Sequence, residues 1–425
     1  MTYGVLTIVL GVVIFLATKL IPTKPEESAQ TEKIDPNSAD KHEQIQKKGE
    51  TPEKLAQWVL KTEKAKTELK EKLCQAPIPN DSKILFGRDK VLIELFNAIH
   101  KGSTFIALYG RSGVGKTALA LEVVRKYKYN FQNIKLYLDF SGEKENALST
   151  RDAMVQIILS FRPTMRIPEN ITQLKKLYRL VMTRHQGVLV LDNVASANQV
   201  KELKPAASSS WLLIVTARKK LDLNAAYCVE VEPLDVESAQ EFLIHCSLRL
   251  KPRAREIAKL CRCLPLVLEM CGQFLSSKMK VHPEDFVDLF RKYRSNSFLE
   301  KVDDDEESLL AAFKAIYNSL KDKEQVVFSQ LAVFPASFDA AASSQVCEEN
   351  GNCLKSLTQF GLVKINLVTK RYILHDWVRN QLKNYLPEAI AREAKLRHAT
   401  YYLPVLNAAR EDILKGGQKA SEGIQ

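Results

Sequence analysis

The sequence lacks any pair of cysteines at the CxxC spacing, although it contains eight cysteines among 425 residues. Cys261 and Cys263 lie two residues apart, but no second ligand pair accompanies them, which argues against a zinc site. Most of the cysteines lie in apolar or helical contexts, as buried free thiols do. The cysteine pattern therefore predicts reduced thiols in a reducing compartment.

A concentrated basic segment is also missing, although the formal net charge is +12. Lysine and arginine are spread among acidic residues, and clusters such as the four basic residues within 249–255 are small. A basic excess distributed in this way is typical of a solvated surface and not of a nucleic-acid groove. We therefore expect no nucleic-acid partner.

Charge is absent from residues 2–18. A helix of this length spans about 25 Å, and continuing it through Ile21 gives about 30 Å, which suffices for a bilayer if Lys19 extends to the interface. We predict a single transmembrane anchor over residues 1–22, with the rest of the chain in the cytoplasm because the positive charges follow the run. The alternatives are a cleaved signal peptide, which would want a basic start and a small-residue cleavage site, and a buried core helix.

The overall composition, with 45% hydrophobic and 26% charged residues, is that of a folded protein. A chain of this length is too long for one ordinary core, so two to four domains are expected. Residues 23–75 are predicted to be a charged linker followed by a helix that starts at Thr51 and Pro52. Pro77 and Pro79 break that helix and mark the start of the next domain.

A phosphate-binding motif, GRSGVGKT, occupies residues 110–117, between a predicted apolar strand at 104–109 and a predicted helix. This is GxxxxGK(S/T) in the context that the motif requires, because glycines let backbone N–H groups close around phosphate oxygens at a helix N-terminus. Lys116 supplies a positive charge to the β and γ phosphates, and the Thr117 hydroxyl ligates Mg²⁺. The predicted nucleotide-binding residues of this loop are Gly110, Ser112, Gly113, Val114, Gly115, Lys116, Thr117 and Ala118. We predict ATP or ADP with Mg²⁺ as the bound ligand.

A second apolar run, Val188–Leu191, ends in Asp192, about 75 residues after the phosphate-binding loop. At that spacing it is a candidate Walker B strand, in which Asp192 holds Mg²⁺. Asn193 follows, where many hydrolysing relatives carry a second acid as the base that activates water. Because an amide cannot take a proton at neutral pH, we expect slow hydrolysis.

Features of several other P-loop families are missing. A Ras-like GTPase needs an NKxD-type guanine reader, which is absent. A transporter ATPase needs an LSGGQ signature between the two Walker motifs, and the only similar stretch, at 414–418, lies far beyond Asp192. Small-molecule kinases usually end well before 425 residues.

Four further stretches occur in a recognisable order along the chain. They are Leu85-Phe86-Gly87-Arg88-Asp89, Thr216-Ala217-Arg218, Cys261-Arg262-Cys263-Leu264-Pro265-Leu266 and Leu374-His375-Asp376. They resemble the hhGRE, sensor 1, GLPL and MHD motifs of the NB-ARC family, which includes apoptotic-protease activators, plant disease-resistance proteins and bacterial signalling ATPases. The sequence departs from those motifs at Asp89, Ala217, Cys263 and Leu374.

The resemblance implies a fold and a set of roles. The fold is an α/β P-loop NTPase with a parallel sheet over 76–232, a helical subdomain over 233–300 and a winged-helix subdomain over 301–385. Lys116, Asp192 and Arg218 would be the catalytic residues, with Arg218 sensing the γ-phosphate. Arg88 would lie near the nucleotide, Pro265 would pack on the adenine, and His375 would reach the β-phosphate of ADP.

The same resemblance implies a signalling switch that is closed with ADP and that opens or self-associates with ATP. Residues 386–425 resemble the start of a tetratricopeptide array, so a sensor or effector protein is an expected partner. The alternative is a motor-like or substrate-directed ATPase that cycles continuously. The winged helix also raises the alternative of DNA binding. Two points argue against it: in the family this module packs on the nucleotide domain, and the predicted anchor would keep the protein away from DNA.

Overall fold

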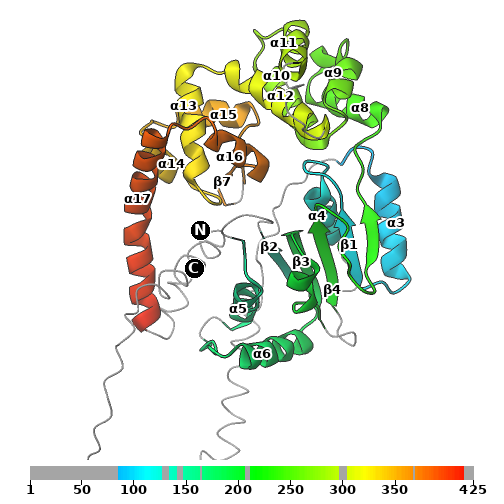
Figure 1. The fold of residues 1–425 in the computed structure, drawn as a ribbon, viewed down its shortest axis with the longest axis vertical. Helices are drawn as coiled ribbons and strands as arrows, with labels where there is room; N and C mark the ends of the chain where they lie inside the picture. The colour runs from blue at the N-terminus through cyan, green and yellow to red at the C-terminus, as the bar shows by residue number, and fades with distance from the viewer. Residues whose placement is uncertain are drawn as a thin grey trace, which may run out of the picture.

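The computed structural model describes residues 85–126, 134–140, 147–162, 165–205, 211–295, 304–366 and 369–415 (Figure 1). The predicted anchor at 1–22 and the predicted linker and helix at 23–75 lie outside these residues. None of the helices in these ranges is both long enough and apolar enough to cross a bilayer.

The centre of the nucleotide-binding part is a five-stranded parallel sheet in the order β2-β3-β4-β1-β5. Its strands are β1 (Phe105–Tyr109), β2 (Lys135–Asp139), β3 (Gly187–Val194), β4 (Trp211–Ala217) and β5 (Tyr227–Glu230). The strand before the phosphate-binding loop and the strand that carries Asp192 are therefore separated by β4 alone. The predicted parallel-sheet α/β fold is confirmed, and both predicted strands are present.

Helices cover both faces of this sheet, which explains why its central strands are almost continuously apolar. One face carries Val190 and Ile214 and packs against α3 (Asp89–His100) and α4 (Lys116–Lys126). The other carries Leu189 and Leu213 and packs against α5 (Thr150–Phe161) and α6 (Ile171–Arg184). The short helix α7 (Ala197–Lys201) follows β3. Alternation along each strand thus assigns its side chains to one face or the other.

Polar caps fix where several helices begin. The Ser149 hydroxyl accepts a hydrogen bond from the backbone N–H of Asp152 at the start of α5. Asn170 accepts from two backbone N–H groups at the start of α6. Such caps satisfy donors that have no partner within the helix.

Beyond β5 the chain becomes helical, as predicted. The next elements are α8 (Val236–Cys246), a 3₁₀ turn (Leu248–Leu250), α9 (Ala254–Leu260), α10 (Pro265–Ser277) and α11 (Pro283–Ser295). Pro265 is the first residue of α10, the position where a missing N–H costs nothing. This helix begins directly against the phosphate-binding loop.

Helix α12 (Asp304–Asn318) packs on α10 and α11, and a further block follows it (Figure 1). That block contains α13 (Asp322–Gln330), a 3₁₀ turn (Leu331–Val333), α14 (Ala340–Cys347), α15 (Asn352–Gln359), the antiparallel pair β6 (Lys364–Ile365) and β7 (Tyr372–Ile373), and α16 (Asp376–Lys383). The long helix α17 (Glu388–Lys415) follows and packs on α14. The block is joined to α10 by an ion pair between Lys364 and Glu269, whose Nζ and Oε2 atoms lie 2.8 Å apart.

Candidate functional site

The loop between β1 and α4 needs glycine for its backbone conformation and for its close contacts with neighbouring segments. Gly110 and Gly113 have φ angles of +148° and +77°, in the region where residues with a Cβ are strained. A Cβ at Gly110 would lie 2.5 Å from the Val231 carbonyl oxygen, and one at Gly113 would lie 3.0 Å from the Leu266 Cβ. The loop is thus held between the end of β5 and the start of α10, and both approaches require glycine.

Lys116 closes this loop on itself. Its Nζ donates to the carbonyl oxygens of Gly110 at 2.8 Å and Arg111 at 2.7 Å. The pKa of Lys116 is lowered to about 8, mainly by burial. The charge of Asp192 opposes this shift, and the charge of Arg218 adds to it. Lys116 is mostly protonated at pH 7. The charges of Asp192 and Arg218 both act on this ammonium group, and Arg218 itself is exposed.

Asp192 is buried and receives hydrogen bonds from three hydroxyl groups. Thr117 Oγ1 donates to its two carboxylate oxygens at 2.9 and 3.0 Å, Thr216 Oγ1 donates to Oδ1 at 2.5 Å, and Tyr137 Oη donates to Oδ2 at 2.8 Å. Burial raises the pKa of Asp192, and these three bonds together with the charge of Lys116 oppose that effect.

The two predicted metal ligands, Thr117 and Asp192, therefore lie in direct contact. A hydroxyl and a carboxylate at the N-terminus of α4 are the hard oxygen ligands that Mg²⁺ prefers, so the residues present fit this ion. The sequence patterns did not single out Tyr137, because it comes from an edge strand and carries no motif. Thr216 lay within the sensor 1 stretch, but no role had been predicted for it.

Asn193 sits in a bulge of β3. Its φ is +58°, its backbone N–H donates to Thr216 Oγ1 at 2.9 Å, and the pairing with β4 shifts register between Leu191 and Val194. Asparagine tolerates this left-handed conformation better than most residues. Bulges of this type re-aim side chains at the end of a strand.

Arg88 is buried and fastens the loop to the segment after β5. Its guanidinium donates to the carbonyl oxygen of Val114 at 2.8 Å and to that of Glu232 at 2.8 Å. Burial lowers the pKa of Arg88, and the charge of Asp235 partly opposes this shift. The rigid, planar fork of a guanidinium group suits two carbonyl acceptors at once. In the structure, Arg88 therefore supports the nucleotide loop through its backbone.

The turn before α10 places Pro265 and Leu266 over the same loop. The backbone N–H of Leu266 donates to the Gly113 carbonyl oxygen at 3.1 Å, and Pro265 Cγ lies 3.9 Å from the Cβ position of Gly115. Arg262 and Cys263 both have left-handed φ angles, +50° and +55°. A glycine would take this conformation without strain, whereas a side chain costs about 1 kcal/mol or more.

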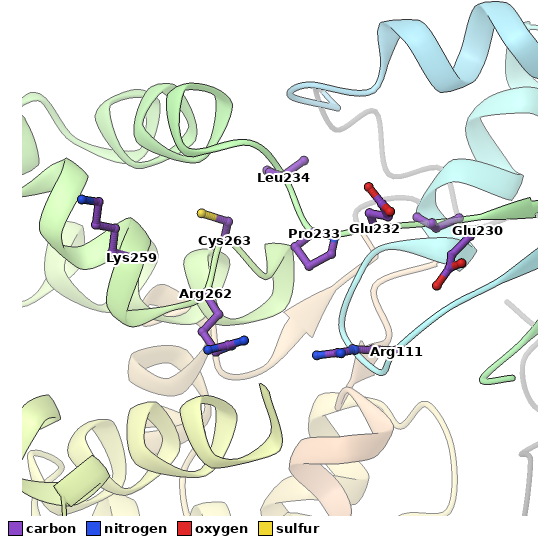
Figure 2. A pocket seen from close by; sticks show the side chains of 9 residues that line it. Arg111, Glu230, Glu232, Pro233, Leu234, Lys259, Arg262 and Cys263 are labelled. Atoms are coloured by element: carbon purple, nitrogen blue, oxygen red, sulfur yellow. The ribbon is translucent and has the colours of Figure 1, made fainter. Parts of the chain in front are cut away.

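A cavity of about 550 Å³ adjoins the loop on the side of β5 (Figure 2). It lies between the tip of the loop, the segment from β5 to α8, and the turn between α9 and α10. Figure 2 shows Arg111 and Arg262 approaching each other from opposite walls, while Glu230 and Glu232 lie toward the end of β5. Charges of both signs therefore line this opening.

His375 caps the N-terminus of α16, with Nδ1 accepting the backbone N–H of Trp377 at 3.2 Å. Because Nδ1 accepts, a neutral ring carries its proton on Nε2. Burial lowers the pKa of His375 to about 4, and the charge of Lys364 acts in the same direction. His375 is thus a neutral imidazole at pH 7, with one N–H donor that the cap does not use.

Comparison with known proteins shows what this part of the chain resembles. The model of the NB-ARC domain matches residues 88–247. Regulatory protein AfsR of Streptomyces coelicolor is 24% identical over 288 residues, which is 64% of this chain and 28% of AfsR. AfsR of Streptomyces griseus is 23% identical over 312 residues, which is 69% of this chain and 31% of that protein. This chain therefore spans about a third of the length of these curated relatives.

Among solved structures, a Signal Transduction ATPase with Numerous Domains (STAND) protein with a tetratricopeptide repeat sensor from Pyrococcus horikoshii is similar, with a TM-score of 0.53. Its identity is 18%, and the match covers 80% of this chain and 50% of that one. At this identity the likeness concerns the fold. Pro265 and His375 lie beyond the residues that the family model matches. Residues 88–247, which carry the phosphate-binding loop and the Thr117–Asp192 pair, therefore match the NB-ARC domain of P-loop NTPases.

Proposed function

We propose that this protein is a nucleotide-dependent signalling switch that holds ADP with Mg²⁺ in a closed state and opens or self-associates with ATP. The observation that carries the proposal is the direct contact of Thr117 with Asp192 beside the Lys116 ammonium group. These three residues supply a metal site and a phosphate charge at one helix N-terminus. When bound, Mg²⁺ would neutralise phosphate charge at Thr117 and Asp192.

Slow hydrolysis is part of this proposal. Asn193 occupies the position after Asp192, and its amide cannot accept a proton from water. Its backbone conformation is set by the bulge in β3, so the side chain is aimed by the strand and not by a mobile loop. A protein that turns over slowly keeps its nucleotide long enough for the bound state to act as a signal.

His375 supports the closed state in this proposal. It lies in the block that we propose to be the winged-helix subdomain of residues 301–385. Its Nε2–H is a neutral donor suited to a phosphate oxygen of ADP. A ligand changes a population from 1:99 to 99:1 only with a difference in binding of roughly 5.5 kcal/mol. One hydrogen bond supplies less than that, so a sensor protein or self-association would have to supply the remainder.

The test is to purify the whole chain, denature it and identify any released nucleotide by chromatography. We expect ADP at about one equivalent, together with slow steady-state ATP turnover. An empty site combined with rapid turnover would instead indicate the motor-like ATPase, and a Lys116→Ala variant that bound nucleotide normally would refute both functions.

The membrane anchor at residues 1–22, with the nucleotide site facing the cytoplasm, is proposed separately. Its basis is the uncharged run at 2–18. Carbonate extraction of membranes from cells that express the chain tests it. Retention in the pellet is expected, and release into the supernatant would refute it.

A further inference from the structure

Tyr137 lies on the edge strand β2, on the face of the sheet that carries the phosphate-binding loop. Its neighbours Leu136 and Leu138 point to the opposite face and join the core beneath α5 and α6. Tyr137 instead packs against the core that includes Val190, its partner in β3. Strand alternation therefore aims the tyrosine ring at the end of β3, where Asp192 stands.

The tyrosine hydroxyl donates to Asp192 Oδ2 at 2.8 Å. Burial raises the pKa of Tyr137 well above its usual range, and the charges of Asp192, Asp139 and Asp376 add to this effect.

A buried carboxylate needs donors that fix its orientation as well as its charge. Thr117 and Thr216 hold Asp192 from α4 and β4, while Tyr137 holds Oδ2 from the third side. Partners of this kind, which bind a metal ligand without binding the metal, fix the ligand's orientation, and their loss typically lowers metal affinity about 10- to 100-fold.

We propose that Tyr137 is a positioning residue for the magnesium site, which holds the Asp192 carboxylate in the orientation that Mg²⁺ with nucleotide requires. The inference rests on the proposed nucleotide function and assigns a further residue to it. Tyr137 acts through Asp192, so its removal should change the dependence on Mg²⁺ and leave the contacts between phosphate and loop unchanged.

The experiment compares Tyr137→Phe with the wild-type chain and with Tyr178→Phe. Tyr178 is a suitable control because it is a buried tyrosine in the same part of the protein whose hydroxyl donates to the Leu203 carbonyl oxygen at 2.6 Å, away from Asp192. Binding of a fluorescent ATP analogue is measured first in EDTA and then during a Mg²⁺ titration. For Tyr137→Phe we expect a Mg²⁺ midpoint about tenfold higher, with affinity in EDTA within twofold of wild type. Tyr178→Phe should leave the midpoint unchanged.

The outcomes separate this inference from the proposed function. If the wild-type chain binds no nucleotide, the proposed function fails. If it binds nucleotide and Tyr137→Phe has the wild-type Mg²⁺ midpoint, only the role of Tyr137 is refuted. An equal loss of affinity with and without Mg²⁺ would also refute it, because it would mean that the hydroxyl merely supports the fold.

A second measurement applies if Tyr137→Phe does not fold. The chain is produced with 3-fluorotyrosine at position 137 alone, and its ¹⁹F resonance is followed while Mg²⁺ is added to the nucleotide-bound protein. We expect the resonance to move with the Mg²⁺ titration. A resonance that Mg²⁺ leaves unchanged would overturn the inference.

Discussion

Raising the pH from 7 to 9 should weaken nucleotide binding, because it removes the charge of Lys116. Burial lowers the pKa of this ammonium group to about 8 in the ligand-free protein. Phosphate oxygens placed against it favour the charged form and raise that pKa. Above pH 8, therefore, binding must take up a proton, and each further pH unit costs affinity.

The magnitude follows from the protonated fraction of the free protein. With a pKa of about 8, about 90% of the Lys116 groups are charged at pH 7 and about 10% at pH 9. The dissociation constant for ADP should therefore rise about tenfold between these values, which corresponds to about 1.4 kcal/mol. The arginine in Lys116→Arg stays protonated across this range and should remove the pH dependence, whatever its absolute affinity.

Isothermal titration calorimetry of ADP binding at pH 7, 8 and 9 measures the effect directly. Repeating each titration in buffers of different ionisation enthalpy counts the protons taken up, and we expect uptake to approach one per site at pH 9. A dissociation constant that stays constant from pH 7 to 9, with no proton uptake, would refute the assignment of Lys116 to the phosphate. A pH dependence that persists in Lys116→Arg would assign the proton to another group.

Three further predictions concern the parts that hold the site. Gly113→Ala combines left-handed strain with a close contact to Leu266 of α10, so it should lower the free energy of unfolding in urea by about 2 kcal/mol. Gly102→Ala is the control, because Gly102 has a φ of +93° but no atom within 4 Å of its Cβ position. This variant should lower the free energy of unfolding by only about 1 kcal/mol. Arg88→Met leaves the Val114 carbonyl oxygen without its donor, so the free energy of unfolding should fall by about 2 kcal/mol in the same assay. A urea midpoint equal to that of the wild type would contradict this prediction. The pKa of His375 lies below that of an exposed histidine, so the neutral ring is favoured in the folded protein. The stability that this gives to the folded state is complete above pH 6.5 and is lost as the pH falls toward 4. The free energy of unfolding should fall by at most about 3 kcal/mol over that interval, and His375→Asn, which can still cap α16, should show less of this loss.

The phosphate-binding loop could be predicted from sequence because its chemistry is local. The strand before it, the glycines, Lys116 and the following helix are contiguous, and each has a pattern of its own. Asp192 was predictable for a similar reason, since a carboxylate after a buried strand of a parallel sheet lies at the edge where ligands bind. These predictions needed only the order of elements and the spacing along the chain.

Tyr137 could not be predicted in the same way. Its role depends on the register of β2 against β3, which pairs Tyr137 with Val190 and Asp139 with Asp192. A shift of one residue would turn the tyrosine to the opposite face, toward α5 and α6. Register between strands whose paired residues lie 53 positions apart is set by tertiary packing, and no local motif records it.

The departure from GLPL at Cys263 has a backbone explanation. Glycine at that position of the motif would satisfy the left-handed φ of +55°, and the chain keeps this conformation with a cysteine. The Cys263 carbonyl oxygen still accepts the backbone N–H of Leu234 at 3.0 Å, so the turn retains its contact with the segment after β5. Cys263 therefore carries local strain, and Pro265 still lies over the loop.

Asn193 connects backbone geometry with the rate of hydrolysis. The bulge in β3 needs a residue that tolerates φ of +58°, and asparagine and aspartate tolerate it better than other residues with a Cβ. The fold alone would therefore accept either, and the two differ in one property, since only the carboxylate can take a proton from water. Because Asn193 lies at a half-buried strand end, Asn193→Asp should leave the free energy of unfolding within about 0.5 kcal/mol of the wild-type value. The same variant should raise the rate of steady-state ATP turnover. Asn193→Ala is the matched control, which loses the amide without gaining a base. Equal turnover in the aspartate and alanine variants would show that the missing acid does not set the rate, and the slow step would then be sought in nucleotide exchange.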